Sequence, residues 1–181
     1  AIVDNIMGKD LRLNYEDLST LIKHLINKDY KFKYLLQSKN GELVKEFKKL
    51  KVPSSLYKVP TKGNLSLLKN SDIIISLGWQ STALKGSSTF NKPIIFYSKK
   101  GYPYSNNVFS LEKDKNYRIN KYCKYLWWNE KNFDENMEKL VKNKKYFNFI
   151  DNVTTKLIDE IGFYKGKLED FFNIYFKQII S

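Results

Sequence analysis

Residues 71–98, with the sequence SDIIISLGWQSTALKGSSTFNKPIIFYS, decide the fold of this chain. Apolar, β-branched runs without polar alternation are typical of strands covered on both faces, as in the parallel sheets of α/β proteins. The stretch therefore predicts, in order, a strand over residues 72–77, a loop over 78–80, a helix that begins at Ser81 or Thr82, and a strand over 93–97. In open parallel sheets ligands gather at the carboxyl ends of strands, so we expect a binding site at the loop of this β-α-β unit.

Strand and helix patterns alternate along the rest of the chain. Further strands are predicted over residues 1–6, 31–38, 54–59 and 122–128, and further helices over residues 15–27 behind an Asn14 cap, 42–50, 65–70 and 133–143 behind an Asn132 cap. This alternation predicts an α/β fold, a Rossmann-like, doubly wound parallel sheet of about six strands with flanking helices. In the strand order 3-2-1-4-5-6 the strand over residues 72–77 is the fourth and lies beside the first.

The apolar rhythm of the helices predicts their inward faces. It turns inward Leu18, Leu21, Ile22, Leu25 and Ile26 of the first helix and Phe133, Met137, Leu140 and Val141 of the helix after Asn132. The neighbours Trp127 and Trp128 are expected to point to opposite faces of the sheet, because side chains alternate along a strand. His24 lies on the flank of its helix without a catalytic partner nearby in sequence, so we expect it to be structural or exposed.

The length and the ends of the chain indicate one domain of a larger protein. The 181 residues, 42% of them hydrophobic, suit a single core over residues 1–181. The chain begins at Ala1 in what reads as the interior of a strand, so we expect a fragment of a longer protein. A long loop is predicted over residues 99–120. The C-terminal region, residues 147–181, carries helical patterns over 149–161 and 167–180, and the second is apolar around most of its circumference, as in helices that are buried or docked on a partner.

The net charge indicates the class of binding partner, and the cysteine and histidine content limits disulfides and metal sites. Lysine and arginine number 32 against 19 acidic residues, a net charge of +13, which favours nucleic acid, phosphosugars or an acidic membrane surface, unless the lysine excess reflects an AT-rich genome. One cysteine excludes an internal disulfide and one histidine excludes a histidine-rich metal site, so we predict no metal and no cofactor. No apolar run reaches the roughly 20 residues that span a bilayer. We expect a cytoplasmic protein.

The chemistry available at the loop after residue 77 is anion binding. The chain has no GxGxxG, GxxxxGK[ST], HExxH or GxSxG motif, and no histidine is placed to activate a serine. The helix start offers the N–H groups of Ser81, Thr82 and Ala83, two hydroxyls, and Lys85 one turn inside. These groups suit a diphosphate. The alternative is that Ser81 or Thr82 only caps the helix.

A family resemblance points the same way. Residues 71–104, SDIIISLGWQSTALKGSSTFNKPIIFYSKKGYPY, resemble the C-terminal, nucleotide-binding domain of GT-B glycosyltransferases, most closely those of bacterial surface-polysaccharide synthesis. Residues 162–180 resemble the final helix of that group. The resemblance implies that a nucleotide sugar binds between two Rossmann-like domains, with its phosphates near the serine-threonine turn. It makes this chain the C-terminal half of a two-domain protein, with residues 147–181 docking on the missing N-terminal domain, which would also hold the catalytic base.

Carried over residue by residue, the resemblance defines a substrate-binding set. Ser81 and Thr82 match the serine-threonine pair and Gly78 matches the turn before it, while Trp79 and Gln80 occupy the linking positions. Trp79 either stacks on a base or sugar or packs against the missing domain.

Two positions depart from the family pattern. Gly86 stands where many relatives carry a glutamate that holds a sugar hydroxyl, and Lys39 is a partial match at the end of the second strand. These departures leave the identity of the nucleotide open and also allow a non-catalytic copy. Because the catalytic base would lie on the missing N-terminal domain, the chain by itself is expected to bind a nucleotide weakly and to be inactive.

Three functions follow as hypotheses. The first is the donor-binding domain of a glycosyltransferase in surface-polysaccharide synthesis, peripheral at the inner face of the membrane if its basic surface meets anionic lipid. The second is a non-catalytic flavodoxin-like binding module, which as a signal receiver would need an acidic cluster where only Asp4 and Asp10 are found. The third is a basic nucleic-acid-binding domain, which predicts a steep salt dependence of binding and an exposed basic face with interleaved aromatic residues, although nucleic acid is not the expected partner.

Overall fold

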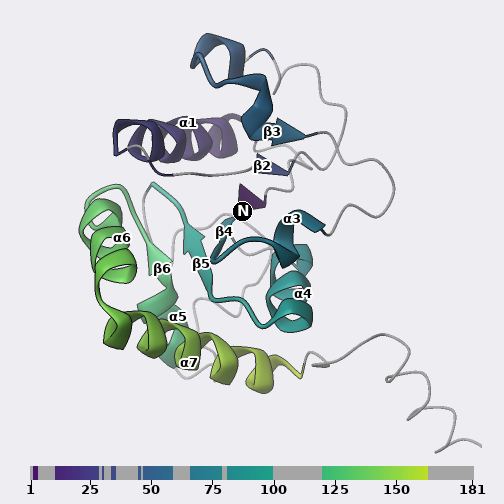
Figure 1. The fold of residues 1–181 in the computed structure, drawn as a ribbon, viewed down its shortest axis with the longest axis vertical. Coiled ribbons are helices and arrows are strands. Elements are labelled where there is room, and N and C mark those ends of the chain that lie inside the picture. Colours follow the sequence, from purple (N-terminus) through teal and green to yellow (C-terminus); the bar gives the residue numbers. More distant parts are fainter. Residues whose placement is uncertain are drawn as a thin grey trace, which may run out of the picture.

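The computed structural model describes residues 2–3, 11–28, 30, 34–35, 45, 47–58, 66–78, 81–99 and 120–162. Within these residues a parallel sheet lies between layers of helices (Figure 1). The predictions for Lys39, for Trp79 and Gln80, for nearly all of the loop over 99–120 and for the helix over 167–180 fall outside the described residues.

The strands pair in parallel throughout. They are β1 (Ile2–Val3), β2 (Tyr34–Leu35), β3 (Tyr57–Lys58), β4 (Ile74–Leu77), β5 (Ile94–Tyr97) and β6 (Trp127–Trp128), in the order β3-β2-β1-β4-β5-β6. In register, Ile75 lies opposite Ile2 of β1 and Ile95 of β5, and Tyr97 lies opposite Trp128. A parallel sheet with flanking helices confirms the α/β class.

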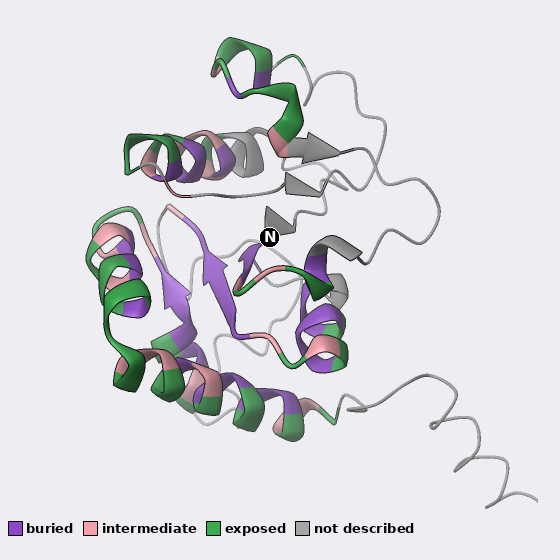
Figure 2. Cartoon of the chain, in the orientation of Figure 1, coloured by how far each residue is buried: buried purple, intermediate pink, exposed green. Residues whose placement is uncertain are grey.

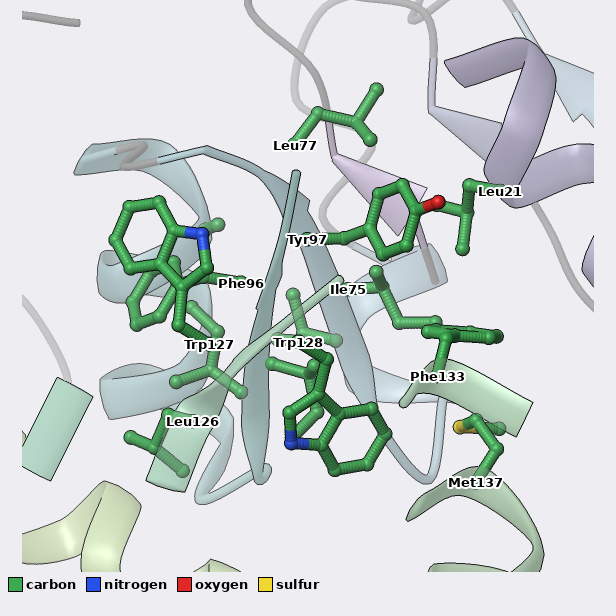
Figure 3. Close-up of a cluster of buried hydrophobic side chains, with 14 of the residues drawn as sticks. Leu21, Ile75, Leu77, Phe96, Tyr97, Leu126, Trp127, Trp128, Phe133 and Met137 are labelled. Carbon is green, nitrogen blue, oxygen red and sulfur yellow. The ribbon is translucent and has the colours of Figure 1, made fainter. Parts of the chain in front are cut away.

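Helices cover both faces of the sheet. They are α1 (Leu11–Asn27), α3 (Ser66–Lys69), α4 (Ser81–Phe90), α5 (Asn120–Leu126), α6 (Phe133–Lys142) and α7 (Lys144–Ile161), with a 3₁₀ turn at Ser54–Leu56. Tyr97 and Trp128 contact Phe133 of α6 on one face (Figure 3). On the other face, α4 and α7 pack against β5, and Thr154 of α7 accepts a hydrogen bond from the Ile94 N–H.

The core lies between these layers, as the apolar pattern predicts. Every described side chain of β4, β5 and β6 is buried, which explains their continuous apolar sequence (Figure 2). Trp127 stacks on Phe96 with ring centroids 5.1 Å apart, while Trp128 meets Phe133 at 5.9 Å. The two tryptophans therefore point to opposite faces, as predicted (Figure 3).

The central β-α-β unit forms where the sequence predicts it. The strands are slightly shorter than expected, and α4 begins at Ser81. The helix predicted over residues 42–50 is helical at residues 45 and 47–49, and the chain then turns at Lys51, which has a left-handed φ of 55°.

Two predicted strands are wrong in part. Residues 120–126 form α5, so only Trp127 and Trp128 remain of the strand predicted over 122–128. The buried residues Cys123 and Leu126 are three positions apart, which is helical spacing, and Lys124 and Tyr125 between them are exposed. Similarly, residues 54–56 form the 3₁₀ turn, and the strand begins only at Tyr57.

Three predictions about helix ends and faces are also corrected. The first helix begins at Leu11, so Asn14 lies inside it, where asparagine costs well under about 1 kcal/mol relative to alanine. The Asn132 side chain makes no cap bond, because its Oδ1 accepts the Asn129 N–H at 2.8 Å. Ile26 and Val141, predicted to face inward, are 42% and 60% exposed, since each lies at the edge of its helix's apolar stripe.

The last described helix begins earlier than its pattern. α7 begins at Lys144 rather than at residue 149, because the Asn143 Oδ1 accepts the N–H groups of Lys145 and Tyr146. It ends at Gly162, whose φ of 76° is left-handed. α7 packs on α5, α6 and α4 of its own chain. Whether residues 147–181 also dock on another domain stays a prediction.

Candidate functional site

The turn after β4 is fixed by its own backbone. Gly78 has a φ of 69°, a left-handed conformation that glycine adopts without strain. Its N–H donates to the Tyr97 carbonyl at 3.0 Å, and its carbonyl accepts the Ser76 hydroxyl at 2.8 Å. Both backbone polar groups of this buried glycine are thus used, and the chain leaves the sheet in a defined direction at its carboxyl edge.

The helix after the turn begins with the predicted pair. Ser81 and Thr82 are the first two residues of α4, and the N–H groups of a helix's first turn have no acceptors in the helix itself. These groups and the positive end of the helix dipole favour an anion. Ala83 and Leu84 are buried and hold the first turn against the core. The structure does not describe the Ser81 and Thr82 side chains.

Lys85 lies on the solvent side of the same helix. It is exposed, whereas its neighbours Leu84 and Gly86 are buried. Lys85 lies one turn after Ser81, near the start of the helix, and its exposure leaves its ammonium group in water. A lysine here can add charge to an anion site without a desolvation cost.

Gly86 has a packing reason to be glycine. A Cβ atom at this position would lie 2.5 Å from Cδ1 of Leu68 on α3 and 3.7 Å from Cδ1 of Ile74 on β4. Leu68 and Ile74 are fully buried. A side chain at position 86 would therefore point into the core, so its glycine does not by itself argue against ligand binding at the turn. The signal in the sequence was the run of small residues Ala83, Gly86 and Ser87, spaced for one helix face.

A second set of polar contacts lies beyond the end of β5 and was missed by sequence reasoning. The Lys99 N–H donates to Oδ1 of Asp17 at 2.7 Å, and the Lys99 ammonium group pairs with Glu16. The hydrogen bond that the Lys99 ammonium group donates to the Glu16 carboxylate raises the pKa of Lys99. These contacts join α1 to a residue more than 80 positions away, so no local spacing could reveal them. They engage Lys99 in an ion pair at the end of β5.

Tyr97, the last residue of β5, carries a buried, neutral hydroxyl group. Its side chain is fully buried, and its hydroxyl has no hydrogen-bond partner among the described residues (Figure 3). Burial raises the pKa of Tyr97 far above its ordinary value, and the carboxylates of Asp17, Glu130 and Asp134 raise it further. Tyr97 therefore stays protonated in the folded protein.

His24 has a structural contact, as one of its two predicted roles requires. Its Nδ1 lies 3.0 Å from Oδ1 of Asp134, and its ring packs against Phe133 with centroids 5.6 Å apart. The contact joins α1 to α6.

The serines near the site serve the backbone. Ser76 donates to the Gly78 carbonyl, and Ser87 donates to the Lys92 carbonyl at 2.5 Å. Both hydroxyls are buried and fix turns. Neither is arranged as a nucleophile, because each donates its proton to a carbonyl.

In the part of the chain that the structure describes, no three side chains of histidine, cysteine, aspartate or glutamate are grouped to bind a metal ion. None of the described helices combines the length and the apolar character that a membrane-crossing segment needs. No family model, curated protein or solved structure matches the chain.

Proposed function

We propose that this chain is the donor-binding domain of a glycosyltransferase-like protein and binds the diphosphate of a nucleotide-activated sugar at the turn between β4 and α4. The observation that carries the proposal is Gly78. Its left-handed φ and its two backbone hydrogen bonds direct the chain from the end of a buried strand into a helix that begins with Ser81 and Thr82. This is the arrangement in which phosphate groups bind to helix N-termini.

The strand order supports the same proposal. The order β3-β2-β1-β4-β5-β6 is that of a Rossmann-like sheet, which we propose as the finer description of the fold. In such a sheet the chain reverses its winding direction between β1 and β4, and ligands bind in the crevice at this point. The turn at Gly78 follows β4 and lies at this place in the order.

The proposal gives each predicted site residue a role. The N–H groups and hydroxyls of Ser81 and Thr82 bind phosphate oxygens, and Lys85 adds a positive charge from the solvent side. Trp79 and Gln80 contact the base or sugar, and Lys39 approaches from the end of the second strand. The acceptor site and the catalytic base belong to a second, N-terminal domain, and within residues 147–181 it is the apolar helix over 167–180 that docks on this domain. The protein acts in surface-polysaccharide synthesis in the bacterial cytoplasm.

Nucleotide titration tests the proposal directly. The protein is titrated with UDP, GDP, CMP and the corresponding sugar donors while amide chemical shifts are followed by NMR. We expect one nucleotide class to shift the resonances of Gly78, Ser81, Thr82, Ala83 and Lys85 together, with weak affinity and no sugar transfer. The amides of Gly162 and its neighbours in α7 serve as the internal control. Absence of a response to every nucleotide, or shifts confined to other surfaces, would overturn the proposal.

A further inference from the structure

The surface shared by α5 and α7 exposes aromatic rings. Tyr125 of α5 and Phe149 of α7 are each 42% exposed and meet edge to face, with ring centroids 5.2 Å apart. Tyr146 stacks on Phe149 with centroids 6.2 Å apart. We name these three residues the aromatic patch. Single exposed apolar side chains need no explanation, but a contiguous group of rings on two helices indicates a contact surface.

Lysines surround the aromatic patch. The Lys124 ammonium group lies 4.7 Å from the centre of the Tyr125 ring. On α7, the exposed residues Lys145 and Lys156 lie four residues before and seven after Phe149, and this helical spacing places all three on one stripe. Lys121 pairs with Glu160 at 3.6 Å, but within the described residues Lys124, Lys145 and Lys156 form no ion pair.

We propose that this face binds the surface of an anionic lipid membrane. Tyr125 and Phe149 enter the headgroup region, and Lys124, Lys145 and Lys156 contact lipid phosphates. Aromatic rings and lysine stems bury apolar atoms at such a surface while the ammonium groups stay in water. The net charge of +13 brings the protein to the membrane from a distance. The inference stands apart from the donor site, because none of these residues belongs to it.

The ring contacts favour lipid over single-stranded nucleic acid. Base stacking needs a free aromatic face. Lys124 lies over the Tyr125 ring, and Tyr146 stacks on Phe149 with an interplanar angle of 28°. A base would have to displace these neighbours, whereas a headgroup region needs only ring edges and ammonium groups. α5 and α7 pack against each other (Figure 1), and the contact between Tyr125 and Phe149 joins their exposed sides.

Vesicle flotation of the whole chain tests the proposal. Binding is measured to phosphatidylcholine vesicles with and without phosphatidylglycerol, at low and high salt, and to an oligothymidine in parallel. We expect binding only to the anionic vesicles, lost at high salt. The triple variant Lys124→Gln, Lys145→Gln, Lys156→Gln should bind about five-fold more weakly per lysine removed. The double variant Tyr125→Ser, Phe149→Ser should lose about five-fold per ring, because much of each side chain is left to bury.

A matched variant separates the patch from net charge. Lys23→Gln, Lys48→Gln, Lys69→Gln removes the same charge from exposed positions on other elements and should leave most of the vesicle binding intact. Equal losses for the two triple variants would overturn the proposal in favour of unspecific charge attraction. So would unchanged binding of the Tyr125→Ser, Phe149→Ser protein, or tighter binding to the oligonucleotide than to the vesicles. Circular dichroism checks that each variant is folded.

Discussion

At the scale of a single residue, Gly86 is explained by core packing and not by ligand binding. Its missing Cβ leaves room for the fully buried side chain of Leu68, through which α3 packs against α4. A larger residue must displace Leu68 from a packed core, so glycine here serves the contact between the two helices. The same position seen in sequence alone reads as a lost ligand contact.

Gly86→Ala should therefore destabilise the protein. Overpacking a core costs about 1–3 kcal/mol, and the gain in helix propensity is only about 1 kcal/mol. Urea unfolding measures the difference. Thr89→Ala, at an exposed position of α4, is the matched control and should cause no loss of stability. A Gly86→Ala variant as stable as the parent would contradict the packing explanation.

Tyr97→Phe should stabilise the protein and reduce its sensitivity to alkali. The substitution removes a buried hydroxyl that lacks a hydrogen-bond partner among the described residues. Its removal should raise the free energy of unfolding by about 1 kcal/mol at neutral pH. Because the folded-state pKa of Tyr97 is raised, the unfolded state loses this proton first, and stability falls as the pH rises above the ordinary tyrosine value of 10.0. Urea unfolding at neutral pH and above pH 10 measures both effects.

The control for this experiment is Tyr125→Phe at an exposed position. It should change the unfolding free energy by less than about 0.5 kcal/mol at either pH. If Tyr97→Phe were strongly destabilising, the Tyr97 hydroxyl would have a hydrogen-bond partner in solution.

At the scale of elements, two glycines in the same conformation end two different elements. Gly78 ends β4 with a φ of 69°, and Gly162 ends α7 with a φ of 76°. A Cβ atom at Gly162 would meet nothing within 4 Å. Substitutions at both glycines should therefore show the same conformational cost, and only a substitution at Gly78 should also move the turn before α4.

Gly78→Ala and Gly162→Ala should each lose about 1–2 kcal/mol of stability, the cost of a left-handed conformation in an L-residue. Only Gly78→Ala should weaken nucleotide binding, because relief of the strain at residue 78 moves the start of α4. Thermal unfolding and nucleotide titration of both variants measure the two effects. Equal nucleotide affinity in both variants would argue against a site at this turn.

At the scale of the whole molecule, local contact and overall charge both attract a nucleotide. The net charge of +13 attracts any anion, and this attraction is screened by salt. A side chain in the site acts in addition through a direct contact. The two effects are separable because many lysines lie far from α4.

Lys85→Gln should weaken donor binding several-fold, about 1 kcal/mol, because it removes a charge-assisted contact to phosphate. Lys69→Gln on the neighbouring α3 removes one exposed charge and should have little effect. Calorimetric titration at two salt concentrations measures both affinities. Equal losses in the two variants would mean that Lys85 acts through overall charge and not at the site.

The sequence by itself determined the parts of this protein that depend on local pattern. The buried runs of β4 and β5, the glycine between them and the start of α4 to within one residue, at Ser81 or Thr82, were all predictable, because burial on both faces and helix initiation leave a mark within a few residues. Where patterns were short, local reading failed. Residues 120–126 are helical because Cys123 and Leu126 share a face against the core, which an apolar run cannot distinguish from a strand.

Only the tertiary structure decided which residues meet across the chain. Three contacts between different elements show this. Lys99 pairs with Glu16, His24 contacts Asp134, and Leu68 fills the space beside Gly86. The aromatic patch is likewise assembled from α5 and α7. Hydrogen bonds, ion pairs and close packing act over a few ångströms in space, and the distance between two residues along the chain does not fix that separation.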